Sequence, residues 1–316
     1  MRAKNDNNDT EAMKQSPVVY PFDWLIVGYS ALILGVVAVF GRPISQYTGQ
    51  IVFSLGTIAL VGLIVRYSDE SRGRVQAFIR ILYPLILFTF MYRMTGGMMH
   101  VIFPGFFDWQ LTAFEKSFFG FHPTIYIDRH LLHTIPNEIF SATYFSYYLM
   151  LPGFLFPVFF LRDYDTVKKT ITALCLTFVI SYVIFFAYPI EGPRWHFAAA
   201  YVNQIQGPVF RPLVEFVIEH GAVRGGAMPS SHVAVAFVVV LSAFRYYRKG
   251  GWVLLPFFIG LIIGTFWGRF HYLSDVAVGL TIGLFSTVLI WRYYDRWMEP
   301  QPDSGVERQQ EIEHAT

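Results

Sequence analysis

Long apolar runs separated by short polar segments dominate the chain and predict helices that cross a membrane. A bilayer core of about 30 Å needs about 20 apolar residues in helical form, because unpaired backbone groups are too costly in hydrocarbon. Eight runs meet or approach this length, and the prolines of the fourth are expected to bend it. The runs are Trp24 to Phe40, Gln50 to Val65, Ile79 to Met98, Ile139 to Leu161 with Pro152 and Pro157, Ile171 to Tyr188, Ser230 to Phe244, Trp252 to Trp267 and Tyr272 to Trp291. The pattern predicts an all-α, polytopic membrane helix bundle with about eight transmembrane helices.

The basic residues fall mainly in alternate connections between these runs, which predicts the orientation of the chain. Lys and Arg are retained on the cytoplasmic side of membrane proteins. If the N-terminus is inside, 16 of the 24 basic residues lie in the inner segments, and every short inner loop is basic. We therefore expect both termini in the cytoplasm. The alternate segments then lie on the extracytoplasmic face, whether periplasmic, extracellular or lumenal.

The composition agrees with a lipid environment and excludes several other classes. The hydrophobic set makes up 54% of the residues and the charged set 15%, which is too apolar for an ordinary soluble domain. A net charge of +2 gives no reason to expect a nucleic-acid partner. The single cysteine, Cys175, excludes a disulfide within the chain and a cysteine-based metal site. No cofactor is expected.

One transmembrane catalytic domain, residues 21–298, is expected between two polar tails. Residues 1–20 are polar, and the first apolar run ends without a small-residue cleavage site, so we interpret it as an anchor and not a removed signal peptide. Residues 299–316 carry almost no apolar side chains, which favours disorder.

Two long outer segments interrupt the spans. Met99 to Glu138 mixes aromatic residues with four histidines and is expected to form one or two helices at the membrane surface. Pro189 to Pro229 joins two spans and holds three arginines. Candidate catalytic residues lie within 189–280.

His271 and Asp275 form the first candidate pair, at the outer start of the last apolar run. Residues four apart share a face of a helix, so Asp275 can accept a hydrogen bond from one ring nitrogen of His271 and leave the other for a substrate. The alternative is a structural His-Asp pair in an interfacial helix. An ionisable pair inside a span is nevertheless a functional candidate, because holding it there is costly.

Pro229-Ser230-Ser231-His232, directly before another apolar run, forms the second candidate motif. Proline suits the first helical position, and the free amides of a helix N-terminus bind an anion well. Ser230 and Ser231 can add hydroxyl donors, and His232 can protonate a leaving oxygen. The alternative is a serine-capped helix start with an incidental histidine.

Arginines on the predicted outer face supply candidate phosphate ligands. Arg194 lies beside Gly192-Pro193, where a guanidinium in a tight loop can offer two donors to phosphate oxygens. Arg211, Arg224 and Arg269 are further candidates on the same face. Each alone is typical of an interfacial arginine that meets lipid headgroups, but four of them near two histidines favour an anion site.

The combined set suits displacement at phosphorus. A neutral imidazole can attack phosphorus, arginines and helix amides can neutralise the oxygens, and a second histidine can protonate the departing alkoxide. This chemistry requires no metal. A metal site is the competing interpretation, but His232, His271 and Asp275 lack a compact ligand motif such as His-Glu-x-x-His, so none is expected.

The ordered pair Pro229-Ser230-Ser231-His232 and His271-x-x-x-Asp275 resembles the motifs of the type 2 phosphatidic acid phosphatase superfamily. That superfamily also includes vanadium haloperoxidases and lipid phosphotransferases. The resemblance covers the C-terminal half of the chain and implies a six-helix catalytic core. It implies that His271 is the nucleophile that forms a phosphohistidine, that Asp275 orients it and that His232 is the general acid.

The chain departs from the phosphatase branch at two places. That branch typically has Lys, six residues and then Arg-Pro, but here Gln204 occupies the lysine position ahead of Arg211. It also has Ser-Arg ahead of the final histidine, where this chain has Gly264-Thr265. We therefore take Arg194 as the first choice for binding phosphate, with Arg211 and Arg269 next. Three features make the chain more similar to the inositol phosphorylceramide synthase and sphingomyelin synthase branch. They are these departures, the motif His271-Tyr272-x-x-Asp275 and the two extra N-terminal spans.

The resemblance predicts an integral membrane lipid phosphotransferase, with membrane lipids as its partners. It would move a phosphoryl group or phospho-headgroup from a phospholipid donor to an alcohol acceptor. A lipid phosphate phosphatase with water as acceptor is the alternative. A third hypothesis, of another class, is a transporter or scaffold whose outer arginines bind anionic lipid without chemistry.

Overall fold

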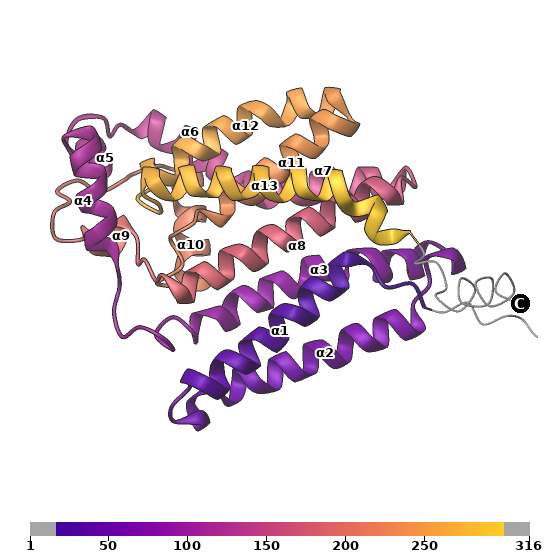
Figure 1. Cartoon of the computed structure of the whole chain (residues 1–316). Coiled ribbons are helices and arrows are strands. Elements are labelled where there is room, and N and C mark those ends of the chain that lie inside the picture. The colour runs from indigo at the N-terminus through magenta and orange to yellow at the C-terminus, as the bar shows by residue number, and fades with distance from the viewer. Residues whose placement is uncertain (1–16, 300–316) are drawn as a thin grey trace, which may run out of the picture.

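The computed structural model describes residues 17–299, so the predicted tails, 1–20 and 299–316, lie almost entirely outside the described residues. Within that range the chain is built from helices, and the long ones lie roughly alongside one another (Figure 1). The helices are α1 (Pro21–Phe40), η1 (Ile44–Tyr47), α2 (Thr48–Tyr67), η2 (Glu70–Arg72), α3 (Arg74–Gly96), α4 (Asp108–Phe119), α5 (Pro123–His130), α6 (Thr134–Phe145), α7 (Tyr147–Phe160), α8 (Tyr164–Ala187), α9 (Pro193–His196), α10 (Phe210–Gly221), α11 (Ser231–Tyr246), α12 (Arg248–Trp267) and α13 (Leu273–Met298).

All eight predicted apolar runs are helical, which confirms the all-α fold class. Seven helical segments of the described residues are long and apolar enough to cross a membrane, and α11 is apolar but shorter. The fourth segment consists of α6 and α7, which meet at Ser146. Pro152 and Pro157, at which a bend was expected, both lie inside α7. The segment is interrupted earlier, at Ser146, whose hydroxyl donates to the carbonyl of Thr143 at 2.6 Å.

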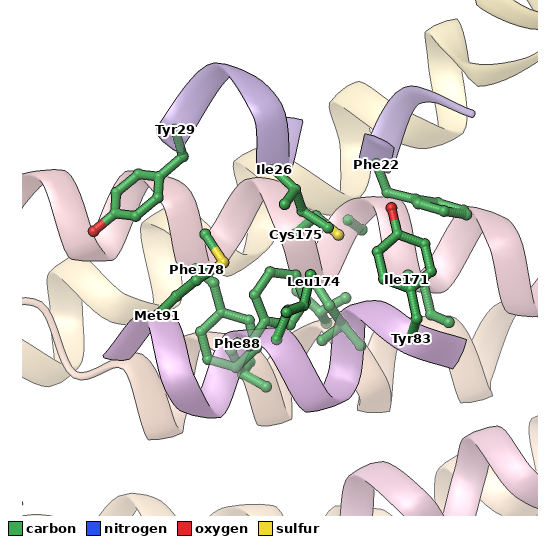
Figure 2. Packing of buried hydrophobic residues seen from close by; sticks show 14 of the residues in the cluster. Phe22, Ile26, Tyr29, Tyr83, Phe88, Met91, Ile171, Leu174, Cys175 and Phe178 are labelled. Atoms are coloured by element: carbon green, nitrogen blue, oxygen red, sulfur yellow. The ribbon is translucent and has the colours of Figure 1, made fainter. Parts of the chain in front are cut away.

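The N-terminal helices pack onto the rest of the bundle through α8. Figure 2 shows apolar side chains of α1, α3 and α8 meeting in one buried layer. In a lipid environment such packing is stabilised mainly by close van der Waals contact. The layer includes Phe22, Ile26, Tyr29, Tyr83, Phe88, Met91, Ile171, Leu174, Cys175 and Phe178.

A buried ion pair lies within the same packing. Arg80 of α3 and Asp23 of α1 are each 2% exposed, and Nη1 of Arg80 donates to Oδ1 of Asp23 at 3.0 Å. The hydroxyl of Tyr83 donates to the same carboxylate at 2.6 Å. Arg80 is one of the 16 basic residues that we assigned to inner segments, but it is buried and pairs with Asp23, and this pair joins α3 to α1.

Four of the five predicted inner segments lie together at one end of the bundle. Contacts of side chains join the α2–α3 connection, the start of α8, the α11–α12 turn and the end of α13. These contacts are Lys168 Nζ to Glu70 Oε1 (3.0 Å), Lys169 Nζ to Asp295 Oδ1 (2.9 Å) and Tyr247 Oη to Asp163 Oδ2 (2.8 Å).

The predicted outer segments gather at the other end, away from the C-terminal end of α13 (Figure 1). The first of them, residues 99–138, forms α4 and α5, as expected for one or two helices. The second, residues 189–229, forms α9 and α10. This end of the bundle therefore carries every candidate catalytic residue.

Candidate active site

Close packing of α11 against α13 brings the two histidine motifs together. A Cβ added to Gly279 of α13 would lie 2.5 Å from the carbonyl oxygen of Ser230, and one on Gly283 would lie 2.5 Å from that of Ala234. Glycines four apart let two helices approach at backbone distance. The amide of Ser230 also donates to the backbone carbonyl of Asp275 at 3.0 Å. The start of α11 is thereby fixed against the first turn of α13.

His271 lies before α13 and not inside it, which corrects the expected helical spacing. The helix begins at Leu273, and Tyr272 is its N-cap, with Asp275 in the capping box. The Asp275 carboxylate accepts from the amide of Tyr272 at 2.8 Å and lies 3.5 Å from Nδ1 of His271. A cap residue has extended backbone, so the i,i+4 geometry of a helix does not apply here.

Nδ1 of His271 makes its shortest contact with a backbone carbonyl. It lies 2.7 Å from the oxygen of Ala227, and Asp275 is the second acceptor near it. Two acceptors on one side of the ring favour the tautomer with the proton on Nδ1, which leaves the lone pair on Nε2. The side chain of His271 is only 5% exposed, so its surroundings hold the ring in place.

His232 is the second residue of α11, and its ring faces that of His271. The two ring centroids are 5.9 Å apart. The hydroxyl of Tyr144 on α6 lies 3.4 Å from Nε2 of His232. The proline of this motif precedes the N-cap and does not occupy the first helical position; Ser230 is the cap and accepts from Val233.

The two serines differ in where they lie. Ser230 is fully buried, and its hydroxyl and amide both contact the protein itself. Ser231 lines a large cavity beside His232. Both were predicted to donate to phosphate, and Ser231 is the one whose side chain borders open space.

Arg194 is the arginine that shares a small cavity with both histidines. This cavity, of about 40 Å³, is also lined by Glu191, Tyr144 and Trp195. A guanidinium nitrogen of Arg194 donates to Glu215 of α10 at 2.6 Å. The guanidinium is thereby held by a carboxylate while it borders the space between the rings.

The other candidate arginines are engaged with acids nearby. Arg211 donates to Glu215, and its guanidinium lies 5.5 Å from the ring centroid of Phe270. Burial raises the pKa of Glu215, but hydrogen bonds and charge from Arg194 and Arg211 outweigh it and hold that pKa below its ordinary value. Glu215 therefore stays ionised and keeps both guanidinium groups in place.

Arg269 and Arg224 form separate pairs. Arg269 donates to Asp128 of α5 at 2.5 Å and to the carbonyl of Asn203 at 2.7 Å. Arg224 donates to Glu191 at 2.5 Å. Neither lines the cavity between the histidines, so Arg194 remains the first choice for binding phosphate.

Asp108, Glu191 and His196 offer ligand atoms within 4.8 Å of one another, which is the spacing of a possible metal site. Both oxygens of Asp108, however, accept hydrogen bonds from the backbone amides of Glu191 and Gly192. A metal would need lone pairs of these oxygens directed at it. The arrangement favours a carboxylate that holds the loop ahead of Arg194.

A second, larger cavity opens next to His232. It has a volume of about 500 Å³ and is bordered by α3, α7, α8 and α10. Its walls are mostly apolar and aromatic, for example Phe88, Phe178 and Tyr182. His232 and Tyr92 line both cavities. A polar head and an apolar tail could therefore occupy adjoining spaces on either side of His232.

A bundle of apolar spans with two histidines and an arginine at one end is typical of a multi-pass membrane protein, here with a candidate anion site beside an apolar cavity. A family model described as PAP2 superfamily matches residues 109–289, more than half of the chain. The chain belongs to the PAP2 superfamily, as the two motifs predicted. The matched part begins in α4 and ends in α13, so α1 to α3 lie outside it.

Two curated proteins show weaker similarity. A PA-phosphatase related-family protein of Dictyostelium discoideum is 23% identical over 200 residues, which cover 56% of this chain and 36% of that protein. The bacitracin transport permease protein BcrC of Bacillus licheniformis is 29% identical over 90 residues, 28% of this chain and 41% of that protein. The matched region thus spans less than half the length of either relative. No solved structure matches the chain.

Proposed function

We propose that the chain is a lipid phosphotransferase that works through a phosphohistidine at His271. The observation that carries the proposal is the pair of imidazole rings, 5.9 Å apart, with Arg194 lining the same cavity. Both rings and Arg194 border the same space, so one anionic group bound there could meet all three side chains. The proposal places the chain with the inositol phosphorylceramide synthase and sphingomyelin synthase branch, as the sequence departures indicate.

The first half-reaction breaks the ester bond of the donor. Nε2 of His271 attacks phosphorus with its lone pair, the bond from phosphorus to the leaving oxygen breaks, and His232 gives a proton to that oxygen. The negative charge of a bound phosphate favours the protonated form of His232 that this step needs. Arg194 and the amides at the start of α11 stabilise the charge on the phosphoryl oxygens.

The second half-reaction returns the enzyme to its starting state. The hydroxyl oxygen of the acceptor attacks phosphorus, the bond between phosphorus and Nε2 breaks, and His232 takes the hydroxyl proton. The histidines then carry the same protons as before. Asp275 and the carbonyl of Ala227 keep Nδ1 of His271 protonated throughout, so that Nε2 remains the reacting atom.

The apolar cavity supports a lipid donor. His232 borders this cavity, so the leaving oxygen that it protonates would belong to the apolar part of the substrate. A volume of about 500 Å³ with aromatic walls fits hydrocarbon better than a soluble alcohol. Water as the acceptor is the second candidate function, and the printed name of the Dictyostelium relative, PA-phosphatase related, favours it.

Labelling of the purified protein with a phospholipid carrying radioactive phosphorus tests the nucleophile. We expect a label that is stable to base and labile to acid in the wild type, and none in His271→Ala. His133→Ala is the matched control, because His133 is an exposed histidine at the N-cap of α6. Equal label in wild type and His271→Ala would remove the nucleophile assignment. Binding of anionic lipid without any label or product would favour a non-enzymatic protein.

Product analysis with different acceptors separates transferase from phosphatase. A transferase gives a new phosphoester whose amount rises with the concentration of acceptor alcohol. Turnover that yields only free phosphate and does not respond to any alcohol would identify water as the acceptor.

We further propose that the histidine end of the bundle faces the extracytoplasmic side, with both termini in the cytoplasm. The basic inner segments at the opposite end support this orientation. A Cys175→Ala background with Ser117→Cys on α4 or Ser71→Cys on η2 tests it in sealed vesicles with an impermeant maleimide. Labelling of Ser71→Cys from the extracytoplasmic side would reverse the assignment.

A further inference from the structure

Helix α4 carries two buried carboxylates on one face. Asp108 and Glu115 lie seven residues apart, which is two helical turns, and they are 1% and 2% exposed. The same helix exposes Trp109, Phe114 and Phe118. Burying a carboxylate is costly unless hydrogen-bond donors surround it, so the donors around these two acids indicate what they do.

Asp108 accepts from three donors that belong to two different loops. Its Oδ2 accepts from the amide of Glu191 at 2.8 Å, and its Oδ1 accepts from the amide of Gly192 at 3.0 Å. The hydroxyl of Tyr272 donates to Oδ1 at 2.9 Å. Burial, followed by the charge of Asp108, raises the pKa of Tyr272, so this hydroxyl stays protonated and remains a donor.

Glu115 accepts hydrogen bonds from Ser274, which follows Tyr272 by two residues. Its Oε1 accepts from both the amide of Ser274 at 2.9 Å and the hydroxyl of Ser274 at 2.7 Å. Tyr272 and Ser274 both lie between His271 and Asp275 in the sequence. One face of α4 is therefore hydrogen-bonded to the segment 271–275, which carries the predicted nucleophile and the acid predicted to orient it.

The loop held by Asp108 reaches the other parts of the site. Ile190 pairs with the 225–227 segment, whose carbonyl at Ala227 is the acceptor for Nδ1 of His271. Arg194 follows Gly192 by two residues. Gly192 has φ of +91°, and a Cβ there would lie 3.1 Å from the carbonyl oxygen of Phe270, so the loop is closely packed onto the residue before His271. Displacement of this loop would move the arginine and the ring acceptor together.

We propose that Asp108 and Glu115 are positioning residues that fix His271 and Arg194 for phosphoryl transfer. The inference rests on the proposed function, because it assigns these acids to the geometry of that reaction. They touch no reacting atom in this arrangement and act through backbone and hydroxyl donors. The sequence gives the acids no motif, since their partners lie 83 to 164 residues away.

The two acids differ in a way that makes the proposal testable. Asp108 uses both oxygens, so Asp108→Asn replaces one acceptor with an NH₂ group that faces a backbone N–H. Both Ser274 donors meet the same oxygen of Glu115, Oε1, so Glu115→Gln can keep a carbonyl oxygen for both of them. A displacement of 1 Å can cost about 10²-fold in rate. We expect Asp108→Asn to lower kcat by about this factor with KM nearly unchanged, and Glu115→Gln to remain close to wild type.

Measurements on the full chain in detergent or vesicles separate the possible outcomes. Single-turnover labelling of His271, steady-state kcat and KM, vanadate inhibition and thermal unfolding are compared for Asp108→Asn, Tyr272→Phe, Glu115→Gln and Glu115→Ala. Tyr272→Phe removes one of the three donors and serves as a milder variant should Asp108→Asn fail to fold. A kcat loss in folded Asp108→Asn and Tyr272→Phe, with recovery in Glu115→Gln relative to Glu115→Ala, supports the proposal.

The positioning role and the proposed function would be contradicted by different results. Wild-type kcat and labelling rate in Asp108→Asn, in a preparation whose wild type labels at His271, would overturn the positioning role alone. A loss of kcat that only follows a loss of thermal stability, with the folded fraction fully active, would also overturn it. Absence of any phosphohistidine in the wild type would instead remove the proposed function.

Discussion

Substitution of Gly279 by alanine tests whether the close approach of α11 and α13 sets the geometry of the histidine pair. Gly279 lies one helical turn after Asp275, on the face of α13 that meets Ser230. A Cβ at this position would lie 2.5 Å from the carbonyl oxygen of Ser230. Carbon and oxygen in close backbone contacts are normally about 3.3 Å apart. The helices must therefore separate by roughly 0.8 Å at the point where they carry the two histidine motifs.

The expected effect falls on rate more than on stability. Overpacking costs about 1–3 kcal/mol, whereas replacing a helical glycine by alanine gains about 1 kcal/mol, so the protein should remain folded. A shift approaching 1 Å between the two rings, in contrast, should lower kcat by about 10- to 100-fold. Gly283→Ala, one turn further from the site and 2.5 Å from the carbonyl oxygen of Ala234, should have a smaller effect on rate.

Single-turnover labelling of His271 and thermal unfolding measured on the same samples provide the assay. Gly62→Ala is the matched control, because Gly62 lies in α2 and a Cβ there meets nothing within 4 Å. We expect the control to keep the wild-type labelling rate. A folded Gly279→Ala protein that labels and turns over like the wild type would refute the idea that this helix contact sets the site.

Three further predictions address the buried ion pair of the core, the Glu215 carboxylate and the large apolar cavity. Asp23→Ala leaves the buried charge of Arg80 without its partner and should cost about 3–5 kcal/mol in denaturant unfolding, whereas Arg72→Ala, which breaks the exposed pair with Asp69 but keeps the Asp69 cap of η2, should not change stability measurably. Hydrogen bonds from Arg194 hold the pKa of Glu215 below its ordinary value despite burial, so its contribution to stability is present above the unfolded pKa of about 4.3 and is lost as pH falls through the lower folded pKa. The melting temperature of Glu215→Gln should therefore fall less than that of the wild type on acidification from about pH 5 to pH 3, and an equal fall in both would contradict this role. Leu85→Trp narrows the large cavity and should raise KM for long-chain donors while short-chain donors react as before; equal effects on both would show that the tail lies elsewhere.

The fold was largely predictable because hydrophobic length is a local property of the sequence. The length of each apolar run is enough to predict a helix that can face lipid. The alternation of basic and less basic loops then assigns each loop to one of the two ends of the bundle. The interruption of the fourth span was not predictable in this way. Pro152 and Pro157 mark positions that lack a backbone N–H donor, but α7 continues through both, and no residue type in the sequence marks the break at Ser146.

The site was predictable where its residues form short motifs. His232 follows a serine cap, and His271 precedes an acid at fixed spacing, so both could be singled out without tertiary structure. The placement of His271 inside a helix was wrong, because Tyr272 is not a residue type that usually marks an N-cap and so gave no sign of where the helix begins. The carbonyl of Ala227 could not have been found, because a backbone acceptor leaves no trace in residue type.

The residues proposed to position the site gave no signal in the sequence for a different reason. Asp108 and Gly192 are 84 residues apart, and Glu115 and Ser274 are 159 apart, so only the folded chain brings them together. In the sequence these acids stand in an aromatic outer segment that gave no functional signal. Glu215 was missed likewise, because its role depends on two guanidinium groups that converge from α9 and α10.

One wall of the large cavity comes from outside the part of the chain that matches the superfamily. The part shared with the superfamily, residues 109–289, contains both histidines, Asp275 and Glu115. Asp108 lies one residue before it. Helix α3 lies outside that part, yet Leu85, Phe88 and Tyr92 form one wall of the cavity that ends at His232. A helix that is not needed to build the histidine pair can change the shape of this wall without disturbing the reacting groups. We therefore expect exchange of Leu85 or Phe88, which line the large cavity but not the small one, to alter which lipid tail is accepted, while the rate of phosphohistidine formation from a short-chain donor stays the same.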